Sequence, residues 1–333
     1  MSVLAWNCRG VGKSSFPILI KDLKFRYKVS ILALFEVKIG GARGEEIIRK
    51  LGFPNYYRQD PVGFSGGIWL LWEGSMVDVQ VLDNHHQFIH TRVSYLESLA
   101  SEFVTFVYGS PRRLERRSLW ADLEAISSGV AGPWMVLGDF NAILKASEKI
   151  GGKDLCYKSM EEFNQCLIDC EISDLGYKGP DFTWKRGRLH ERLDRVCANE
   201  AWSLAWDYRY VSHLPYYNSD HRPVLLCDGG HSAPVEHTRS FKFMAAWLTD
   251  SRFNDLVRNS FEGDVNWLDA RNQFESEAKV WHQDVFKEEI KKKNRLYSRL
   301  NGLDSYRFGK YDHNTELLQK ELWRKLQAIL VQE

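Results

Sequence analysis

Trp134-Met135-Val136-Leu137-Gly138-Asp139-Phe140-Asn141 runs from four apolar residues into an acid and an amide. A short apolar run of this kind predicts a buried strand. Because side chains alternate along a strand, Asp139 and Asn141 should share one face, about 7 Å apart, while Phe140 turns to the core. The stretch therefore predicts a sheet edge that presents an acid and an amide together.

Other polar residues stand where apolar runs end or begin. Asn7 and Glu36 each close such a run, and the adjacent pair Asp220 and His221 precedes another. Burying the carboxylate of Glu36 is costly unless it is paired or binds a cation, and Lys38 is the alternative partner. Asp220 and His221 would face opposite sides of an extended chain, so one of them requires a bend. A sheet edge that collects acids, amides and an imidazole suits metal-assisted hydrolysis of a phosphodiester.

The composition allows a large globular protein with no strong overall charge. The 333 residues are 44% hydrophobic, enough for one large domain with an extension or for two domains. Since 45 basic residues nearly balance 44 acidic ones, contact with nucleic acid must come from a local patch. The six cysteines form no Cys-x-x-Cys pair and no signal peptide precedes the first strand-like run, so we expect reduced thiols in an intracellular protein. No apolar stretch approaches the ~20 residues that span a bilayer, and no membrane partner is expected.

Strand-like and helix-like segments alternate up to about residue 226, with Gly, Pro, Asn and Asp at the joins. This pattern predicts an α/β fold. Three successive strand-like segments between residues 67 and 93 have no helix between them, which implies antiparallel pairing and therefore two mixed sheets flanked by helices. The expected strands cover residues 3–6, 31–35, 67–72, 77–82, 88–93, 102–108, 134–137, 182–185, 192–196 and 224–226, and the expected helices cover residues 16–27, 44–51, 112–126 and 159–170.

The character of the sequence changes after Cys227. We expect a domain over residues 1–228, a linker rich in Gly, Ser, Pro and His over residues 229–240, and a helical extension over residues 241–333. In the extension, leucines recur at helical spacing from Leu318 onwards, and such amphipathic helices need a partner surface. That surface could belong to the first domain, to a second copy of the chain or to another protein.

Six short motifs follow one another along the first domain. They are Trp6-Asn7-Cys8-Arg9-Gly10, Phe35-Glu36-Val37-Lys38, Val107-Tyr108-Gly109-Ser110-Pro111, Gly138-Asp139-Phe140-Asn141, Arg192-Leu193-Asp194-Arg195 and Ser219-Asp220-His221-Arg222-Pro223. In this order they resemble the endonuclease/exonuclease/phosphatase superfamily, and within it the apurinic-type endonuclease domain of plant LINE-type (non-LTR) retrotransposons. The resemblance implies a four-layer α/β sandwich over residues 1–228, which agrees with the expected strands and helices.

The resemblance also implies a metal site. Glu36 would be the principal ligand, Asp220 would lie near the same ion, and Asn7 would support the ion and the phosphate. Mg²⁺, with Mn²⁺ as an alternative, suits these oxygen ligands.

The resemblance assigns the chemical work to further residues. Tyr108 would donate its hydroxyl to the scissile phosphate. Asp139 would position or deprotonate the attacking water, helped by Asn141. His221, oriented by Asp194, would contact the phosphate and stabilise its developing charge.

The implied activity is that of a metal-dependent DNA endonuclease that hydrolyses phosphodiester bonds and leaves a 3′-hydroxyl nick, as in target-primed retrotransposition. Two alternatives stay open: a phosphatase or phosphodiesterase of the same superfamily acting on a small phosphorylated substrate, and an inactive retroelement remnant that serves as an interaction module. Val37 replaces the family's usual Thr, Arg9 stands where abasic-site repair enzymes carry an acid, and no reverse transcriptase segment follows the linker. A nuclear location is expected, and the basic run from Lys291 to Lys293 would suit either import or a solvated helix face.

Two groups of residues are candidates for DNA contact. Arg112 and Arg113 follow the third motif, and Lys185 and Arg186 lie beside Trp184. Phosphate contacts would give salt-dependent affinity, and an aromatic side chain beside them could stack or wedge at a base step. A solvated helix face and a hairpin tip are the alternative explanations for these two groups.

Overall fold

The computed structural model describes residues 1–333 except 62–65, 99, 153, 207, 228, 230–246, 249, 262–265, 286, 306–312 and 333. The chain divides into two compact units. One comprises Met1–Gly230 with Asp304–Tyr311, and the other comprises His231–Leu303 with Asp312–Glu333. The linker expected over residues 229–240 lies outside the described part, apart from Gly229.

The first sheet of the larger unit has six strands. In spatial order they are β14 (Tyr210–His213), β15 (Val224–Cys227), β1 (Ser2–Asn7), β2 (Val29–Phe35), β4 (Ile68–Trp72) and β3 (Asn55–Gln59). The neighbours β1 and β2 run parallel, and the other neighbours pair antiparallel. All seven residues of β2 are buried, as an unbroken apolar sequence predicts for a central strand.

The second sheet also has six strands. In spatial order they are β10 (Ser173–Asp174), β13 (Asp194–Ala198), β8 (Trp134–Asp139), β7 (Ser101–Tyr108), β6 (Phe88–Tyr95) and β5 (Val77–His85). Here β7 and β8 run parallel and the other neighbours antiparallel, so both sheets are mixed as expected. The expected meander is displaced by one strand, because β4 joins the first sheet and the meander is β5-β6-β7. A small third sheet contains β11 (Trp184–Arg186), β12 (Leu189–Glu191) and β9 (Lys149–Ile150).

The two large sheets pack face to face over one core. Ala5 and Phe35 of the first sheet belong to the same cluster of buried side chains as Phe106, Leu137 and Val196 of the second. Because side chains alternate along a strand, the neighbours of these residues point to the outer faces of the sheets. Those faces need a second layer of apolar cover.

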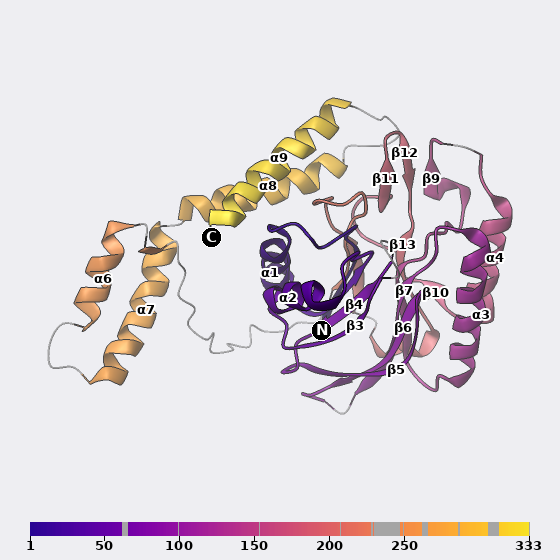
Figure 1. The fold of residues 1–333 in the computed structure, drawn as a ribbon, viewed down its shortest axis with the longest axis horizontal. Helices are drawn as coiled ribbons and strands as arrows, with labels where there is room; N and C mark the ends of the chain where they lie inside the picture. The colour runs from indigo at the N-terminus through magenta and orange to yellow at the C-terminus, as the bar shows by residue number, and fades with distance from the viewer. Residues whose placement is uncertain are drawn as a thin grey trace. The chain divides into compact units, whose positions relative to one another are not determined.

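Two helices cover the outer face of the first sheet (Figure 1). On α1 (Phe16–Tyr27), Phe16 stacks on the Trp6 ring of β1 with 5.8 Å between ring centroids. Next, α2 (Gly41–Leu51) approaches β4 so closely that a Cβ added at Gly44 would lie 3.1 Å from the Trp69 ring.

Two longer helices lie side by side on the outer face of the second sheet (Figure 1). Trp120 of α3 (Arg113–Gly129) and Phe163 of α4 (Tyr157–Asp169) stack at 4.9 Å between centroids, and Phe140 packs against both rings. Short helices at Ala146–Glu148 (η1) and Glu200–Ala205 (α5) complete this unit. Helix, sheet, sheet and helix make four layers, which confirms the expected α/β sandwich.

The smaller unit is helical. It contains α6 (Ser251–Phe261), α7 (Trp267–Val285), α8 (Lys287–Ser305) and α9 (His313–Gln332). Phe253 and Ala278 join α6 and α7 in one buried cluster, and Leu322 and Leu326 of α9 are buried as their spacing predicts. Within the part of this unit that the structure describes there is no strand. None of the described helices in the chain is both long and apolar enough to cross a membrane.

His213 of β14 is a buried, uncharged histidine. It is 4% exposed, and its Nδ1 lies 2.7 Å from the carbonyl oxygen of Pro180. Burial lowers the pKa of His213, and the nearby charges of Arg192 and Arg222 lower it further. The Pro180 carbonyl and Asp174 oppose these effects, and the pKa settles at about 3.

Acidification should therefore destabilise the protein through His213. Between the ordinary pKa of 6.5 and the folded-state pKa of about 3, only the unfolded chain binds this proton. The contribution of neutral His213 to the free energy of unfolding is present above pH 6.5. As the pH falls below that value, the free energy of unfolding decreases by about 1.4 kcal/mol per pH unit. In urea unfolding, the wild-type chain should lose about 1.5 kcal/mol more than His213→Asn between about pH 6.5 and about pH 5. Equal losses in the two proteins would contradict this account, since Asn keeps a donor for Pro180 but does not titrate.

Candidate active site

Polar side chains meet where the parallel strands of both sheets end. Asn7 is the last residue of β1, and Glu36 directly follows β2. Tyr108 and Asp139 are the last residues of β7 and β8, and they stand opposite each other in the register of that pair. The carboxyl ends of parallel neighbours lie at the same edge of a sheet, so these four side chains collect at one edge of the sandwich.

Asp139 is the centre of this group and has no exposed surface. Its Oδ2 accepts hydrogen bonds from Asn7 Nδ2 at 2.9 Å and from Asn141 Nδ2 at 3.1 Å, and its Oδ1 accepts one from the Asn141 backbone N–H at 2.9 Å. Burial and the nearby Asp194 carboxylate raise the pKa of Asp139, while His221 and the amide donors oppose the rise. Asp139 is thus oriented by amides and is a stronger base than an exposed aspartate.

The expected reason for the pairing of Asp139 with Asn141 is wrong, although the pairing itself is present. Strand β8 ends at Asp139, and Asn141 has a left-handed backbone with φ +49°, a conformation that Asn tolerates better than most residues. The turn brings the Asn141 amide back onto Asp139 and Gly109 O instead of placing it further along a strand. Phe140 is fully buried, as alternation predicts. At Gly138 an added Cβ would lie 2.0 Å from a backbone oxygen, so this turn needs glycine there.

His221 lies between two carboxylates. Its Nδ1 is 2.9 Å from Asp194 Oδ2, and its Nε2 is 3.8 Å from Asp139 Oδ2 and 3.4 Å from the Asn7 amide. Burial disfavours the charged imidazole, but Asp194 and Asp139 outweigh it and raise the pKa of His221 above its usual range. Ser219 Oγ accepts from the His221 backbone N–H at 3.1 Å and forms the bend that the sequence requires. An imidazolium held by Asp194 therefore faces the same space as Asp139.

Several hydrogen-bond donors from other residues surround the Glu36 carboxylate. Tyr108 donates its hydroxyl to Oε1 at 2.7 Å, and Lys38 Nζ lies 3.0 Å from Oε2. Burial opposes ionisation, but Tyr108, Lys38 and Arg9 lower the pKa of Glu36, so it stays charged. Burial and Glu36 raise the pKa of Tyr108, which therefore keeps its proton. The sequence left open whether Lys38 is a partner of Glu36, and the structure pairs them.

Asp220 pairs with Arg9. Its Oδ2 accepts from Trp184 Nε1 at 2.9 Å and pairs with Arg9 Nη1. The Nε of the same guanidinium is 3.8 Å from Glu36 Oε2. Arg9 thus spans the two carboxylates that the sequence assigns to a metal ion.

Glu36 and Asp220 fit a divalent ion by their donor chemistry. Both present carboxylate oxygens to a shared cation, which is the ligand type that Mg²⁺ and Mn²⁺ prefer. A second set of possible ligands is close by: among the described residues, Asp139, Asp194 and His221 form a group that could hold a metal ion, with donor atoms within 4.8 Å of one another. There the imidazole nitrogens face carboxylates and an amide, an arrangement suited to moving and stabilising protons.

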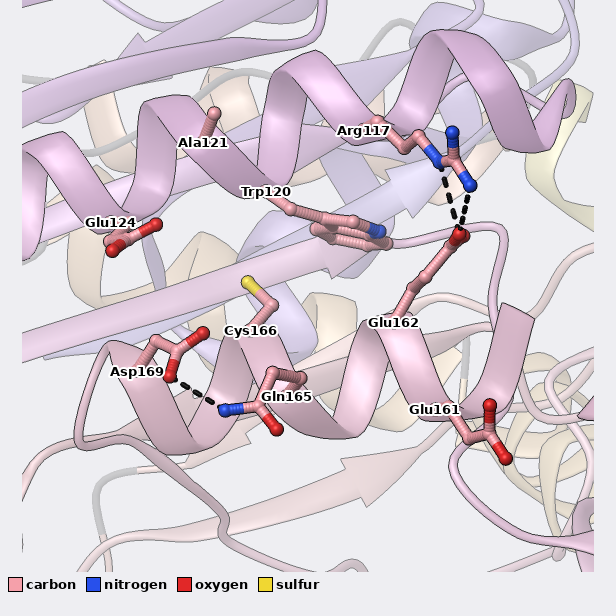
Figure 2. Close-up of a pocket in the computed structure, with 9 residues that line it drawn as sticks. All are labelled: Arg117, Trp120, Ala121, Glu124, Glu161, Glu162, Gln165, Cys166 and Asp169. Atoms are coloured by element: carbon pink, nitrogen blue, oxygen red, sulfur yellow. Dashed lines mark hydrogen bonds and ion pairs between the residues drawn. The ribbon is translucent and has the colours of Figure 1, made fainter. Parts of the chain in front are cut away.

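The arginines after the third motif are paired with acids. Arg112 is exposed and lies 2.8 Å from Glu115, while Arg113 lies 2.7 Å from Glu162 of α4. Figure 2 shows the groove between α3 and α4, with Trp120 at its wall. Arg117, which lines this groove, also donates a hydrogen bond to Glu162. None of the residues drawn in that groove belongs to the candidate active site.

The β11–β12 hairpin reaches the active site through its aromatic residue. The backbone of Trp184 pairs with that of His221 in an isolated antiparallel β-bridge, and its indole N–H donates to Asp220. Lys185 lies over the Tyr216 ring at 4.3 Å, and Arg186 is exposed. The structure therefore joins this group of DNA-contact candidates to Asp220, whereas Arg113 is held in an ion pair with Glu162 of α4.

The fold and the site define a class of protein: a two-sheet α/β sandwich with acids, amides and an imidazole at the carboxyl ends of its parallel strands. The chain belongs to the endonuclease/exonuclease/phosphatase family, whose match covers residues 4–221, more than half of its length. Members of this family are generally hydrolytic enzymes that use divalent metals. Among curated proteins, none matches this chain in sequence.

Solved structures with the same fold include nucleases. The endonuclease domain of TRAS1, a telomere-specific non-LTR retrotransposon, is similar with a TM-score of 0.51 at 15% identity, over 69% of this chain and 99% of that one. The 3′-5′ exonuclease NExo from Neisseria meningitidis has a TM-score of 0.52 at 17% identity, over 69% and 100%. An AP endonuclease from Archaeoglobus fulgidus has a TM-score of 0.52 at 14% identity, over 69% of this chain and 100% of that one. At these identities the likeness shows the fold.

A buried ion network that the sequence did not reveal lies behind Asp194. Arg195 has no exposed surface, and its guanidinium lies 2.9 Å from both Glu148 and Asp174. Arg192 contacts the same two acids at 3.1 and 2.7 Å. The only sequence signal was the pair of arginines on either side of Asp194. The network ties β13 to β10 and to η1, while the backbone pairing of β13 with β8 sets Asp194 opposite Asp139.

Removing one member of this network should destabilise the fold strongly. Glu148→Ala removes a carboxylate that balances the charge of the buried Arg195 guanidinium. We therefore expect a loss of about 3 to 5 kcal/mol in the free energy of unfolding. Urea unfolding measures it. Glu46→Ala, which removes an exposed partner of Lys50, is the control and should leave the midpoint unchanged. Similar midpoints for the two variants would show that the network contributes little.

Proposed function

We propose that this chain is a divalent-metal-dependent DNA endonuclease that leaves a 3′-hydroxyl nick, as in target-primed retrotransposition. The observation that carries the proposal is the buried Asp139, held by two amides beside an imidazolium and next to a carboxylate pair that fits a metal ion. The fold shared with an AP endonuclease and with a retrotransposon endonuclease domain supports a nucleic-acid substrate. Such a substrate would place the enzyme in the nucleus.

Glu36 and Asp220 would hold the ion, with Mg²⁺ or Mn²⁺ as the natural choice, and Asn7 would support it from the neighbouring strand. A bound ion supplies Lewis acidity, which polarises a phosphoryl oxygen and stabilises the leaving 3′ oxygen. Tyr108 already orients Glu36 through its hydroxyl, and because it keeps its proton it can also donate to a phosphate oxygen.

Asp139 is the proposed general base. A carboxylate offers about four lone-pair sites, and amide donors fill two on Oδ2 and one on Oδ1. The remaining site on Oδ1 can accept a proton from an attacking water. The raised pKa of Asp139 makes it a better proton acceptor near neutral pH than an ordinary aspartate.

His221 is the proposed charge stabiliser. Asp194 accepts the Nδ1 proton, and together with Asp139 it raises the pKa of His221 to about 9, so the charged imidazolium carries a second proton on Nε2, which faces the site. A donor in this position can bind the non-bridging oxygens of a phosphate as negative charge develops on them. Asp194 acts through His221 and has no contact with substrate in this scheme.

The purified chain should convert supercoiled plasmid to open circles with Mg²⁺ or Mn²⁺ and should not do so in EDTA. Asp139→Asn removes the proton acceptor but keeps the shape of the side chain, so its rate should fall by about 10² to 10⁴. Direct extension of the nicks by a DNA polymerase would reveal the 3′-hydroxyl end. Asp169→Asn, at an exposed acid of α4, is the matched control and should nick at the wild-type rate.

Three results would contradict the proposal, each in its own way. Nicking in EDTA would show that no metal is required. Turnover of small phosphate esters with no action on DNA would favour a phosphatase. A folded chain that hydrolyses neither substrate with any divalent ion would favour an inactive remnant whose remaining role is to bind partners.

DNA binding should depend on the β11–β12 hairpin more than on α3. Arg186 is exposed two residues along β11 from Trp184, whereas the guanidinium of Arg113 is held by Glu162. In EDTA, Arg186→Gln should therefore reduce the slope of log affinity against log salt by about one, and Arg113→Gln should leave it unchanged. Fluorescence anisotropy with a short duplex at several salt concentrations measures both slopes. The reverse pattern would place the contact on α3.

A further inference from the structure

Arg9 is directed over the site by the turn that follows β1. It has a left-handed backbone with φ +50°, and Gly10 continues the turn with φ +112°. The Arg9 backbone N–H donates to Asn7 Oδ1 at 3.2 Å, which ties the turn to the last residue of the strand. The side chain is therefore anchored at its base while its guanidinium reaches across the edge of the site.

The guanidinium is more exposed than the acids it contacts. Its Nη1 pairs with Asp220 and its Nε lies 3.8 Å from Glu36, and the Arg9 side chain is 49% exposed against 16% and 20% for the two acids. Arg9 thus covers the carboxylate pair from the solvent side. Solvent can surround Arg9 if it leaves, whereas the two acids would stay half-buried and charged.

The two carboxylates are matched in charge by the two cations that contact them. Glu36 and Asp220 bring two negative charges, and Arg9 and Lys38 bring two positive ones. A divalent ion that binds both acids must replace a cation that already contacts both of them. Lys38 pairs with Glu36, whereas Arg9 pairs with each acid, so Arg9 is the cation that the ion would displace.

We propose that Arg9 is a competing cation built into the metal site, and that it transfers to a phosphate of the nucleic acid when the ion binds. The inference rests on the proposed metal site of Glu36 and Asp220. A displaced Arg9 stays tethered at the site edge, where a phosphate would lie, and the planar guanidinium pairs with phosphate oxygens in a bidentate manner. Ion and substrate would then support each other's binding, because the substrate gives Arg9 a new partner.

Metal binding without nucleic acid tests the first half of the proposal. The affinity for Mn²⁺ can be measured from the electron paramagnetic resonance signal of the free ion, with no turnover involved. Arg9→Gln removes the competitor and should bind Mn²⁺ about tenfold more tightly than wild type. Arg9→Lys keeps the charge and should stay within about threefold of wild type. Lys13→Gln is the control, because this substitution also removes one positive charge. Lys13 is exposed and donates a hydrogen bond to Asn218.

Duplex binding in an Asp139→Asn background, where cleavage should be about 10² to 10⁴ times slower, tests the second half. With Mn²⁺ present, Arg9→Gln should weaken binding of a short duplex and reduce the salt slope by about one phosphate contact. In EDTA, where Arg9 remains paired with the two acids, the same change should leave the slope unaltered. A slope that drops equally in both conditions would show a permanent phosphate contact and overturn the transfer.

The outcomes separate this inference from the function on which it rests. If neither wild type nor Arg9→Gln binds Mn²⁺, the metal site itself is wrong. If wild type binds Mn²⁺ and Arg9→Gln binds it no more tightly, the metal site stands and the competition is wrong. Circular dichroism of each variant confirms that the comparison is between folded chains, and Arg9→Ala, which removes the same charge and should also bind Mn²⁺ about tenfold more tightly than wild type, supplies the comparison should Arg9→Gln fail to fold.

Discussion

The arrangement of the site depends on a buried hydrogen bond between the two sheets of the sandwich. Asn7 Nδ2 of the first sheet donates to Asp139 Oδ2 of the second at 2.9 Å, and both side chains are buried. The contact requires the parallel strand pairs of the two sheets to end opposite each other. Glu36, Tyr108 and His221 are positioned by this arrangement, since each follows, ends or faces one of the same strands. A polar link in a low-dielectric interior specifies one relation between the layers and penalises others.

The sequence predicted the fold best where burial is complete. All seven residues of β2 are apolar or small and buried, so the strand was evident, and α1 was found with its observed bounds. The strand β3, Asn-Tyr-Tyr-Arg-Gln, was missed because it is a partly exposed edge strand without alternation. Likewise β4 was recognised as a strand but assigned to the wrong neighbours. Membership of a sheet depends on contacts between distant segments, which local periodicity does not encode.

Several residues that the sequence singled out lie together in the structure, but the sequence did not predict their geometry. Asp139 and Asn141 do act as a pair, yet a left-handed turn brings them together, and no periodicity rule anticipates that conformation. Arg9 was noted only as a departure from a motif, because its partner Asp220 lies far along the chain. The same holds for Arg195, whose partners Glu148 and Asp174 come from two other segments. Local sequence identifies which groups are present, while folding decides how their charges are matched.

Because the site has one wall from each sheet, the apolar core between the sheets sets its dimensions. Phe35 and Phe106 fill that core from opposite sides, and Phe35 directly precedes Glu36. A change of side-chain volume there would alter the spacing of the layers, and a hydrogen bond such as that between Asn7 and Asp139 needs a donor–acceptor distance within about 2.7 to 3.2 Å and a near-linear angle. Core positions that never meet a substrate can therefore tune the site, and drift in the core offers this fold a route to new substrates that leaves every polar residue in place.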